Sequence, residues 1–187
     1  MAEAQRIAAF AGLGSIGRTG RFLMEPLPNL ARFIFRGSEA AAHDLGLAFG
    51  ADLSREPLKA NATADGRAAL WLGPDEWLLI GPEADHAAIL GIVAATVIEP
   101  SSLVDISHRN TGILLSGSRV EPVLNAGCPL DLDVSAFPVG MSTRTVLAKV
   151  EIVLWRKAAS TFHLECGRSF APYVHGFVAE AAREFLG

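Results

Sequence analysis

The sequence predicts an α+β protein in which antiparallel sheets are packed with helices and two ferredoxin-like halves follow the same βαββαβ plan. Short apolar strand patterns alternate with helix-period segments along most of the chain. The chain also matches itself: Phe33–Ser38 aligns with Ile113–Ser118, and Glu76–Val93 aligns with Phe162–Val178. Because the matching segments lie about 80 residues apart, they indicate a duplicated half rather than a solenoid repeat.

The composition is that of a globular domain. The chain has 187 residues, of which 50% are hydrophobic and 19% are charged, and its formal net charge is −4. This balance gives no reason to expect binding to nucleic acid. The apolar stretch Ala87–Ile98 is shorter than the roughly 20 residues of a membrane helix, and no secretion signal opens the chain. We therefore expect a cytoplasmic protein in which Cys128 and Cys166 are free thiols.

The first thirty residues differ from the rest. Glycines are frequent there, Arg18 and Arg21 add positive charge, and acidic residues are nearly absent. Because the segment shows neither a helical nor an alternating apolar period, we expect residues 1–30 to form a Gly/Arg/Pro-rich arm outside the core.

Residues 31–187 are expected to form one domain, with halves at about 31–107 and 108–187. In the first half the patterns predict strands at Phe33–Arg36, Arg67–Leu72, Trp77–Ile80 and Leu103–Ser107, a helix capped by Ser38 and ending at Phe49, and a helix over Glu83–Ala95. In the second half they predict strands at Gly112–Leu115, Thr143–Leu147, Val150–Trp155 and Thr161–Cys166, a helix after Ser118 to Asn125, and a helix over Ser169–Phe185. The last helix carries an apolar stripe: Phe170, Tyr173, Val174, Phe177, Val178, Ala181 and Phe185.

The segment Gly12–Gly17 spells the dinucleotide fingerprint G-x-G-x-x-G. That motif needs a helix after it, whose N-terminus meets the pyrophosphate. The following residues, Arg18–Pro28, are too short and too interrupted by glycine and proline for such a helix. We therefore interpret the motif as a chance match.

No constellation for catalysis or metal binding stands out. No two of the five histidines show H-x-x-x-H spacing, neither cysteine has a second one nearby, and no G-x-S-x-G elbow occurs. His163 and Cys166 are expected on opposite faces of one strand. We expect the chain to carry no catalytic, metal-binding or cofactor-binding residue.

Two polar or aromatic segments allow two interpretations each. Asp105 and Arg109 lie in a polar cluster at a strand end, which fits a salt-bridged corner better than a small-molecule site. Trp71, Asp75 and Trp77 mark a hairpin that is either an exposed interface with aromatic anchors or a part of the core. We expect these three residues, together with Arg18 and Arg21 of the arm, to contribute to a partner interface.

Four motifs in one order resemble the gamma subunit of heterotetrameric sarcosine oxidase. They are Trp71–Trp77 (WLGPDEW), Val104–Asn110 (VDISHRN), Gly127–Leu132 (GCPLDL) and Gly167–Ala171 (GRSFA). That family is similar to the folate-binding domain of aminomethyltransferases, a fold of two ferredoxin-like halves. Related folate-dependent iron–sulfur maturation proteins carry Lys-Gly-Cys-x-x-Gly-Gln, and this chain lacks the Lys and the Gln around Cys128.

The resemblance implies a small, cofactor-free gamma subunit with a structural role in assembly. In the family, the alpha and beta subunits carry FAD, FMN and NAD, the alpha subunit holds tetrahydrofolate, and a delta subunit completes the complex. The complex oxidises sarcosine to glycine and hydrogen peroxide and passes a one-carbon unit to tetrahydrofolate. The sequence leaves open whether the isolated chain associates with itself.

An alternative is a stand-alone tetrahydrofolate-binding or aminomethyltransferase-like protein. In that interpretation Asp105 and Arg109 would surround the pterin ring.

Overall fold

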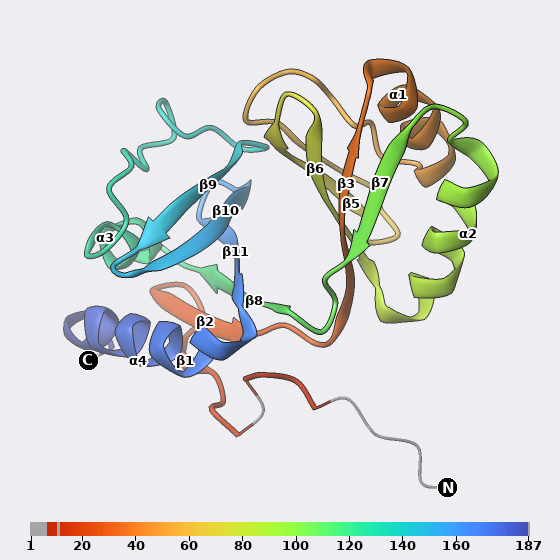
Figure 1. Cartoon of the computed structure of the whole chain (residues 1–187). Coiled ribbons are helices and arrows are strands. Elements are labelled where there is room, and N and C mark those ends of the chain that lie inside the picture. Colours follow the sequence, from red (N-terminus) through yellow and green to blue (C-terminus); the bar gives the residue numbers. More distant parts are fainter. Residues whose placement is uncertain (1–6, 11, 187) are drawn as a thin grey trace, which may run out of the picture.

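A computed structural model describes residues 7–10 and 12–186 of the chain. It contains two antiparallel sheets, one in each half of the molecule (Figure 1). The predicted α+β class with two ferredoxin-like halves is confirmed. Within the described residues, no helix is both long and apolar enough to cross a membrane.

The first half contains a five-stranded sheet in the order β4-β5-β6-β3-β7. Its strands are β3 (Leu30–Gly37), β4 (Ala60–Ala62), β5 (Ala68–Gly73), β6 (Glu76–Pro82) and β7 (Ser101–Asp105). The helices α1 (Glu39–Phe49) and α2 (His86–Thr96) cover its outer face, and a 3₁₀ turn, η1 (Glu83–Asp85), precedes α2 (Figure 1). Ser38 caps α1 as predicted, because its hydroxyl accepts a hydrogen bond from the Ala41 N–H at 3.2 Å.

The second half contains a six-stranded sheet in the order β1-β2-β8-β11-β10-β9. Its strands are β1 (Ile16–Arg18), β2 (Phe22–Pro26), β8 (Asn110–Ser116), β9 (Ser142–Leu147), β10 (Val150–Ala158) and β11 (Thr161–Gly167). The helices are α3 (Val120–Asn125) and α4 (Ala171–Ala182), and α4 is flanked by η2 (Arg168–Phe170) and η3 (Arg183–Phe185). The repeat found in the sequence corresponds to this layout, since β3 matches β8 and β6 matches β11.

The N-terminal strand β2 completes the second half. In the first half, the last strand β7 pairs with the opening strand β3. In the second half no strand follows α4 in the described residues, and β2 pairs antiparallel with β8 in the equivalent position. A segment from the start of the chain therefore supplies the strand that the ferredoxin-like plan places last.

The expectation that the N-terminal segment lies outside the core is wrong for its described part. Phe22 and Met24 are fully buried, and Phe10 is 2% exposed. All three belong to the apolar core of the second half. The sequence pattern misses them because β2 is short and its pairing partner lies about 90 residues further along the chain. Residues 1–6 of the predicted arm lie outside the described residues.

The glycine motif Gly12–Gly17 leads into β1 rather than into a helix, as predicted. Gly17 has φ +91°, and a side chain there would clash with the Phe22 carbonyl oxygen. Glycine at position 17 therefore allows the tight hairpin between β1 and β2.

The predicted strands and helices of residues 31–187 are all present, with boundaries shifted by a few residues. The predicted stripe on the last helix is only partly buried. Val174 and Val178 are in the core, whereas Phe170 and Tyr173 are 48% and 42% exposed. Ala171 between them is fully buried, so Phe170 and Tyr173 lie on the outward side of a segment that is packed against the core.

Three apolar clusters organise the interior. One lies between the second sheet and α3 and α4, and another lies between the first sheet and α1 and α2. The third joins the two sheets face to face and includes Leu70, Leu78, Ile106 and Trp155. The inner faces of the two sheets thus meet along a seam, and this seam opens into a cleft.

Candidate functional site: the cleft between the two sheets

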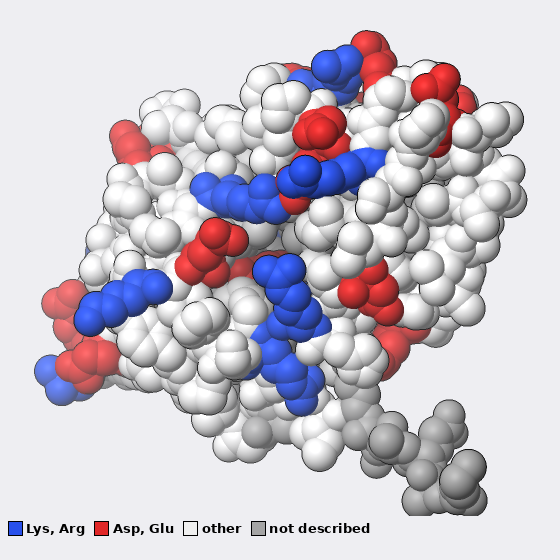
Figure 2. Space-filling model, in the orientation of Figure 1, with Lys and Arg blue, Asp and Glu red and all other residues white. Residues whose placement is uncertain are grey.

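The cleft consists of two adjoining cavities with volumes of about 240 and 200 Å³. They share four lining residues: Arg109, Asn110, Glu151 and Val153. The larger cavity has apolar walls from both sheets, formed by Ile34, Leu72, Leu78, Val104, Ile106 and Val153. Figure 2 shows that blue and red side chains gather around a hollow in the middle of this face.

A buried salt bridge crosses the seam beside the cleft. Arg32 of β3 contacts Glu165 of β11 through two hydrogen bonds, Nε–Oε2 at 2.7 Å and Nη2–Oε1 at 2.9 Å. Both side chains are 1% exposed, and His163 Nε2 lies 2.7 Å from Glu165 Oε1. Burial by itself would raise the pKa of Glu165, but the His163 hydrogen bond and the Arg32 charge outweigh it and hold that pKa below its usual range.

The backbone beside this carboxylate has no room for a side chain. A Cβ atom on Gly112 of β8 would lie 2.5 Å from Glu165 Oε1 and 3.0 Å from His163 Nε2. Glycine at position 112 therefore lets the carboxylate and the imidazole approach the neighbouring strand.

A second ionic bridge lines the larger cavity of the cleft. Glu76 of β6 contacts Arg36 of β3 and Arg144 of β9, so it links the two sheets. Glu76 is 7% exposed, whereas the two arginine side chains are 58% and 40% exposed. Burial alone would raise the pKa of Glu76, but hydrogen bonds and charge from Arg144 and Arg36 lower it. Each guanidinium keeps further N–H donors on its solvent side.

Two other charged side chains at the cleft have no such partner. Arg109 and Glu151 line both cavities, yet neither side chain makes a hydrogen bond or ion pair with any residue in the described ranges 7–10 and 12–186. Their charges are therefore available to a ligand or to another protein.

The remaining ionisable groups near the cleft are either hydrogen-bonded or protonated at neutral pH. Glu165 and His163 form a hydrogen bond with each other, and burial raises the pKa of the Cys166 thiol to about 12. Within the described part of the chain, no nucleophile that lines the cleft hydrogen-bonds to a free base. What this geometry can do chemically is to hold charged groups in fixed positions.

The structure separates Asp105 from Arg109. The Asp105 carboxylate accepts a hydrogen bond from the Ser107 N–H at 2.8 Å and contacts His86 Nε2 of α2 at 2.7 Å. Burial would raise the pKa of Asp105, but these contacts lower it. Its neighbours Val104 and Ile106 line the cleft instead, as alternation along a strand requires. The polar segment is thus a hydrogen-bonded corner, and of the pair Asp105 and Arg109 only Arg109 lines the cleft.

The hairpin with two tryptophans is not an exposed aromatic tip. Trp77 is 1% exposed, packs 6.1 Å from the Phe35 ring between centroids, and donates its indole N–H to the Ser54 carbonyl at 2.9 Å. Trp71 is half-buried beside the same cluster. The placement of Trp77 as a surface anchor is therefore wrong, because strand alternation turns its side chain toward α1. Asp75 is exposed in the turn itself.

The two N-terminal arginines lie at the far edge of the second sheet. Arg18 is exposed in β1, and Arg21 is half-buried just before β2. Neither lines the cleft. Their role in an interface, like that of Trp71 and Asp75, stays a prediction.

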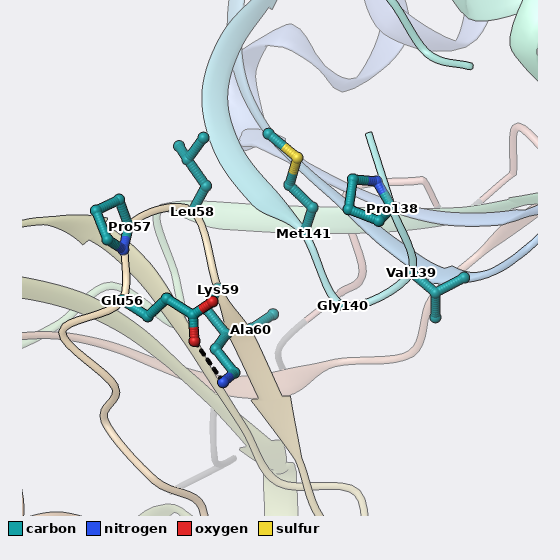
Figure 3. A pocket seen from close by; sticks show the side chains of 9 residues that line it. All are labelled: Glu56, Pro57, Leu58, Lys59, Ala60, Pro138, Val139, Gly140 and Met141. Atoms are coloured by element: carbon teal, nitrogen blue, oxygen red, sulfur yellow. Dashed lines mark hydrogen bonds and ion pairs between the residues drawn. The ribbon is translucent and has the colours of Figure 1, made fainter. Parts of the chain in front are cut away.

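A second junction joins the two halves through the loops 56–60 and 138–141. A cavity of about 250 Å³ lies between the loops 56–60 and 138–141 (Figure 3). The Ala60 N–H donates to the Gly140 carbonyl and the Ser142 N–H donates to the Leu58 carbonyl, both at 2.7 Å. Glu56 and Lys59 pair with each other at 2.6 Å. Backbone hydrogen bonds thus connect the two loops, and the charges of Glu56 and Lys59 are paired with each other.

Sequence reasoning missed the residues that bridge the sheets. These residues are Arg32, Glu76, Arg144 and Glu165. A signal in the sequence was available for Arg32 and Glu165, because each is a charged residue inside a mostly apolar strand.

Comparison with known proteins decides the family. The model of the sarcosine oxidase gamma subunit family matches residues 37–184. The chain belongs to this family. The gamma subunits from Corynebacterium sp. (strain P-1) and from Arthrobacter sp. are each 34% identical over 141 residues, which cover 75% of this chain and 69% of each relative.

Solved structures agree with this assignment to the gamma subunit family. A chain of the heterotetrameric sarcosine oxidase from Corynebacterium sp. U-96, in complex with pyrrole 2-carboxylate, superposes with a TM-score of 0.89 at 25% identity and 97% coverage of both chains. The glycine cleavage system aminomethyltransferase T from Bartonella henselae superposes with a TM-score of 0.64 at 11% identity. That match covers 86% of this chain and 46% of the transferase, and it shows a shared fold.

Proposed function

We propose that this chain is the cofactor-free gamma subunit of a cytoplasmic heterotetrameric sarcosine oxidase and that it acts in assembly. The observation that carries the proposal is the match over 97% of both chains to a member of such a heterotetramer. Its partners are the alpha, beta and delta subunits, which bind FAD, FMN, NAD and tetrahydrofolate. The complex converts sarcosine to glycine and hydrogen peroxide and transfers the one-carbon unit to tetrahydrofolate.

The geometry of the cleft supports a structural role. Its buried carboxylates are neutralised by arginines from the opposite sheet, so they hold the two halves together. The alternative of a stand-alone folate-binding protein loses its motivating pair, since Asp105 contacts His86 and only Arg109 faces the cleft.

The test is an affinity purification of this chain under native conditions, with the candidate partner subunits co-expressed. We expect a yellow eluate that contains a large, a medium and a very small additional chain and has the absorbance of flavin. A colourless chain that elutes alone, although the partners are expressed, would refute the proposal. Titration of the isolated chain with tetrahydrofolate then tests the alternative, which predicts saturable binding.

A further inference from the structure

The cleft combines features that distinguish a protein interface from ordinary surface. Val104 and Phe170, which line the larger and the smaller cavity, are 51% and 48% exposed. Arg109 is a lining residue of both cavities. Arginine and aromatic side chains around a hollow with apolar walls are typical of the residues that dominate binding energy in interfaces.

The charge of the cleft is opposite to that of the whole chain. Glu76 carries one negative charge against the two positive charges of Arg36 and Arg144, so this bridge keeps one positive charge. Arg109 adds a second and Glu151 removes one, whereas the buried pair beside the cleft is neutral. The cleft is therefore net positive in a chain whose formal net charge is −4. A partner with complementary charge therefore presents an acidic group to the cleft.

The cleft is large enough for several side chains of another protein. Its two adjoining cavities have volumes of about 240 and 200 Å³. The free guanidinium of Arg109 offers a two-pronged contact to a carboxylate, and the apolar walls offer burial to the residue beside it.

We infer that the cleft receives a loop of a partner subunit, with an acidic side chain at Arg109 and an apolar side chain against Val104 and Phe170. This inference rests on the proposed function, because it assumes that the chain assembles with partner subunits. It adds the location of the contact, which lies at the junction of the two halves. Binding there contacts both sheets and stabilises their mutual orientation.

The test uses the complete complex, purified through a tag on a partner subunit. The complex is diluted in steps, and native mass spectrometry measures the free and bound fractions of this chain at each step. Arg109→Gln is compared with Arg183→Gln, since Arg183 is 78% exposed and lies at the far end of the chain. Phe170→Ala is compared with Leu47→Ala, since Leu47 is 74% exposed on α1. We expect both cleft variants to raise the dissociation constant of this subunit at least tenfold and both controls to change it less than twofold.

Two readouts separate the possible failures. The thermal midpoint of the isolated Arg109→Gln chain should equal that of the wild type, because the Arg109 side chain makes no hydrogen bond or ion pair within the described residues. If the wild-type chain does not join a complex, the proposed function fails. If the wild type joins but the cleft variants dissociate like their controls, only the present inference is overturned.

Discussion

Arg32 of the first half and Glu165 of the second half form a two-point salt bridge that is buried from solvent, with N–O distances of 2.7 and 2.9 Å. The bridge joins β3 of the first sheet to β11 of the second. Ser107 reinforces this corner, because its hydroxyl accepts a hydrogen bond from the Arg32 backbone N–H at 2.9 Å. One ionic contact thus connects strands whose residues lie 133 positions apart in the sequence.

Removing one partner of this pair should be costly. Glu165→Gln leaves the Arg32 guanidinium buried without a counter-charge, and such losses reach about 3–5 kcal/mol in the free energy of unfolding. Urea unfolding of the isolated chain measures the effect. The double variant Arg32→Met/Glu165→Leu should recover most of the loss, since it removes both charges. A double variant less stable than Glu165→Gln would contradict this account.

The same carboxylate predicts a loss of stability in acid. The pKa of Glu165 is lower in the folded chain than its ordinary value of 4.5, so the folded state binds fewer protons than the unfolded state. The stabilisation is fully present above that ordinary pKa and disappears as the pH falls through the folded pKa. Unfolding free energies measured between pH 7 and pH 3 should decline less steeply in Glu165→Gln than in the wild type. Equal slopes would show that this group does not carry the effect.

Trp77 should behave as a core residue. Trp77→Ala removes a side chain that is 1% exposed together with its hydrogen bond to Ser54, so we expect a loss of about 3–5 kcal/mol. Asp75→Ala, in the exposed turn of the same hairpin, should change stability by less than about 0.5 kcal/mol. Chemical denaturation of both variants makes the comparison. A fully stable Trp77→Ala chain would restore the interpretation of Trp77 as a surface residue.

The strand β2 should be essential to the second half. Met24 is fully buried, so Met24→Ala should lower the free energy of unfolding by about 2–5 kcal/mol. Glu25 is adjacent and exposed, and Glu25→Ala should have little effect. Thermal unfolding followed by circular dichroism tests both. If Met24→Ala unfolds at the wild-type temperature, β2 is not part of the stable sheet.

The sequence predicted best those features that depend on residues close together in the chain. The strand and helix patterns between Phe33 and Phe185 predicted the elements except the short strand β4, and the internal repeat predicted the two ferredoxin-like halves. Local patterns failed for Phe22 and Met24, because β2 has only five residues and depends on pairing with the distant β8.

The candidate site was harder to predict for the same reason. A charged residue in an apolar strand signals a buried partner, yet nothing within the sequence of β3 identifies Glu165 as the partner of Arg32. The polar segment from Asp105 to Asn110 did indicate this corner of the molecule. It could not show that Asp105 contacts α2 while Arg109 faces the cleft, because that difference arises where the chain passes from one sheet to the other.

The most direct test of the central proposal is the native mass of the complex purified through this chain. We predict one species that contains a single copy of this chain with one copy each of three different partners and bound flavin. A species that contains only this chain, as a monomer or a self-assembled oligomer, in cells that express the partners would contradict its role as a sarcosine oxidase gamma subunit.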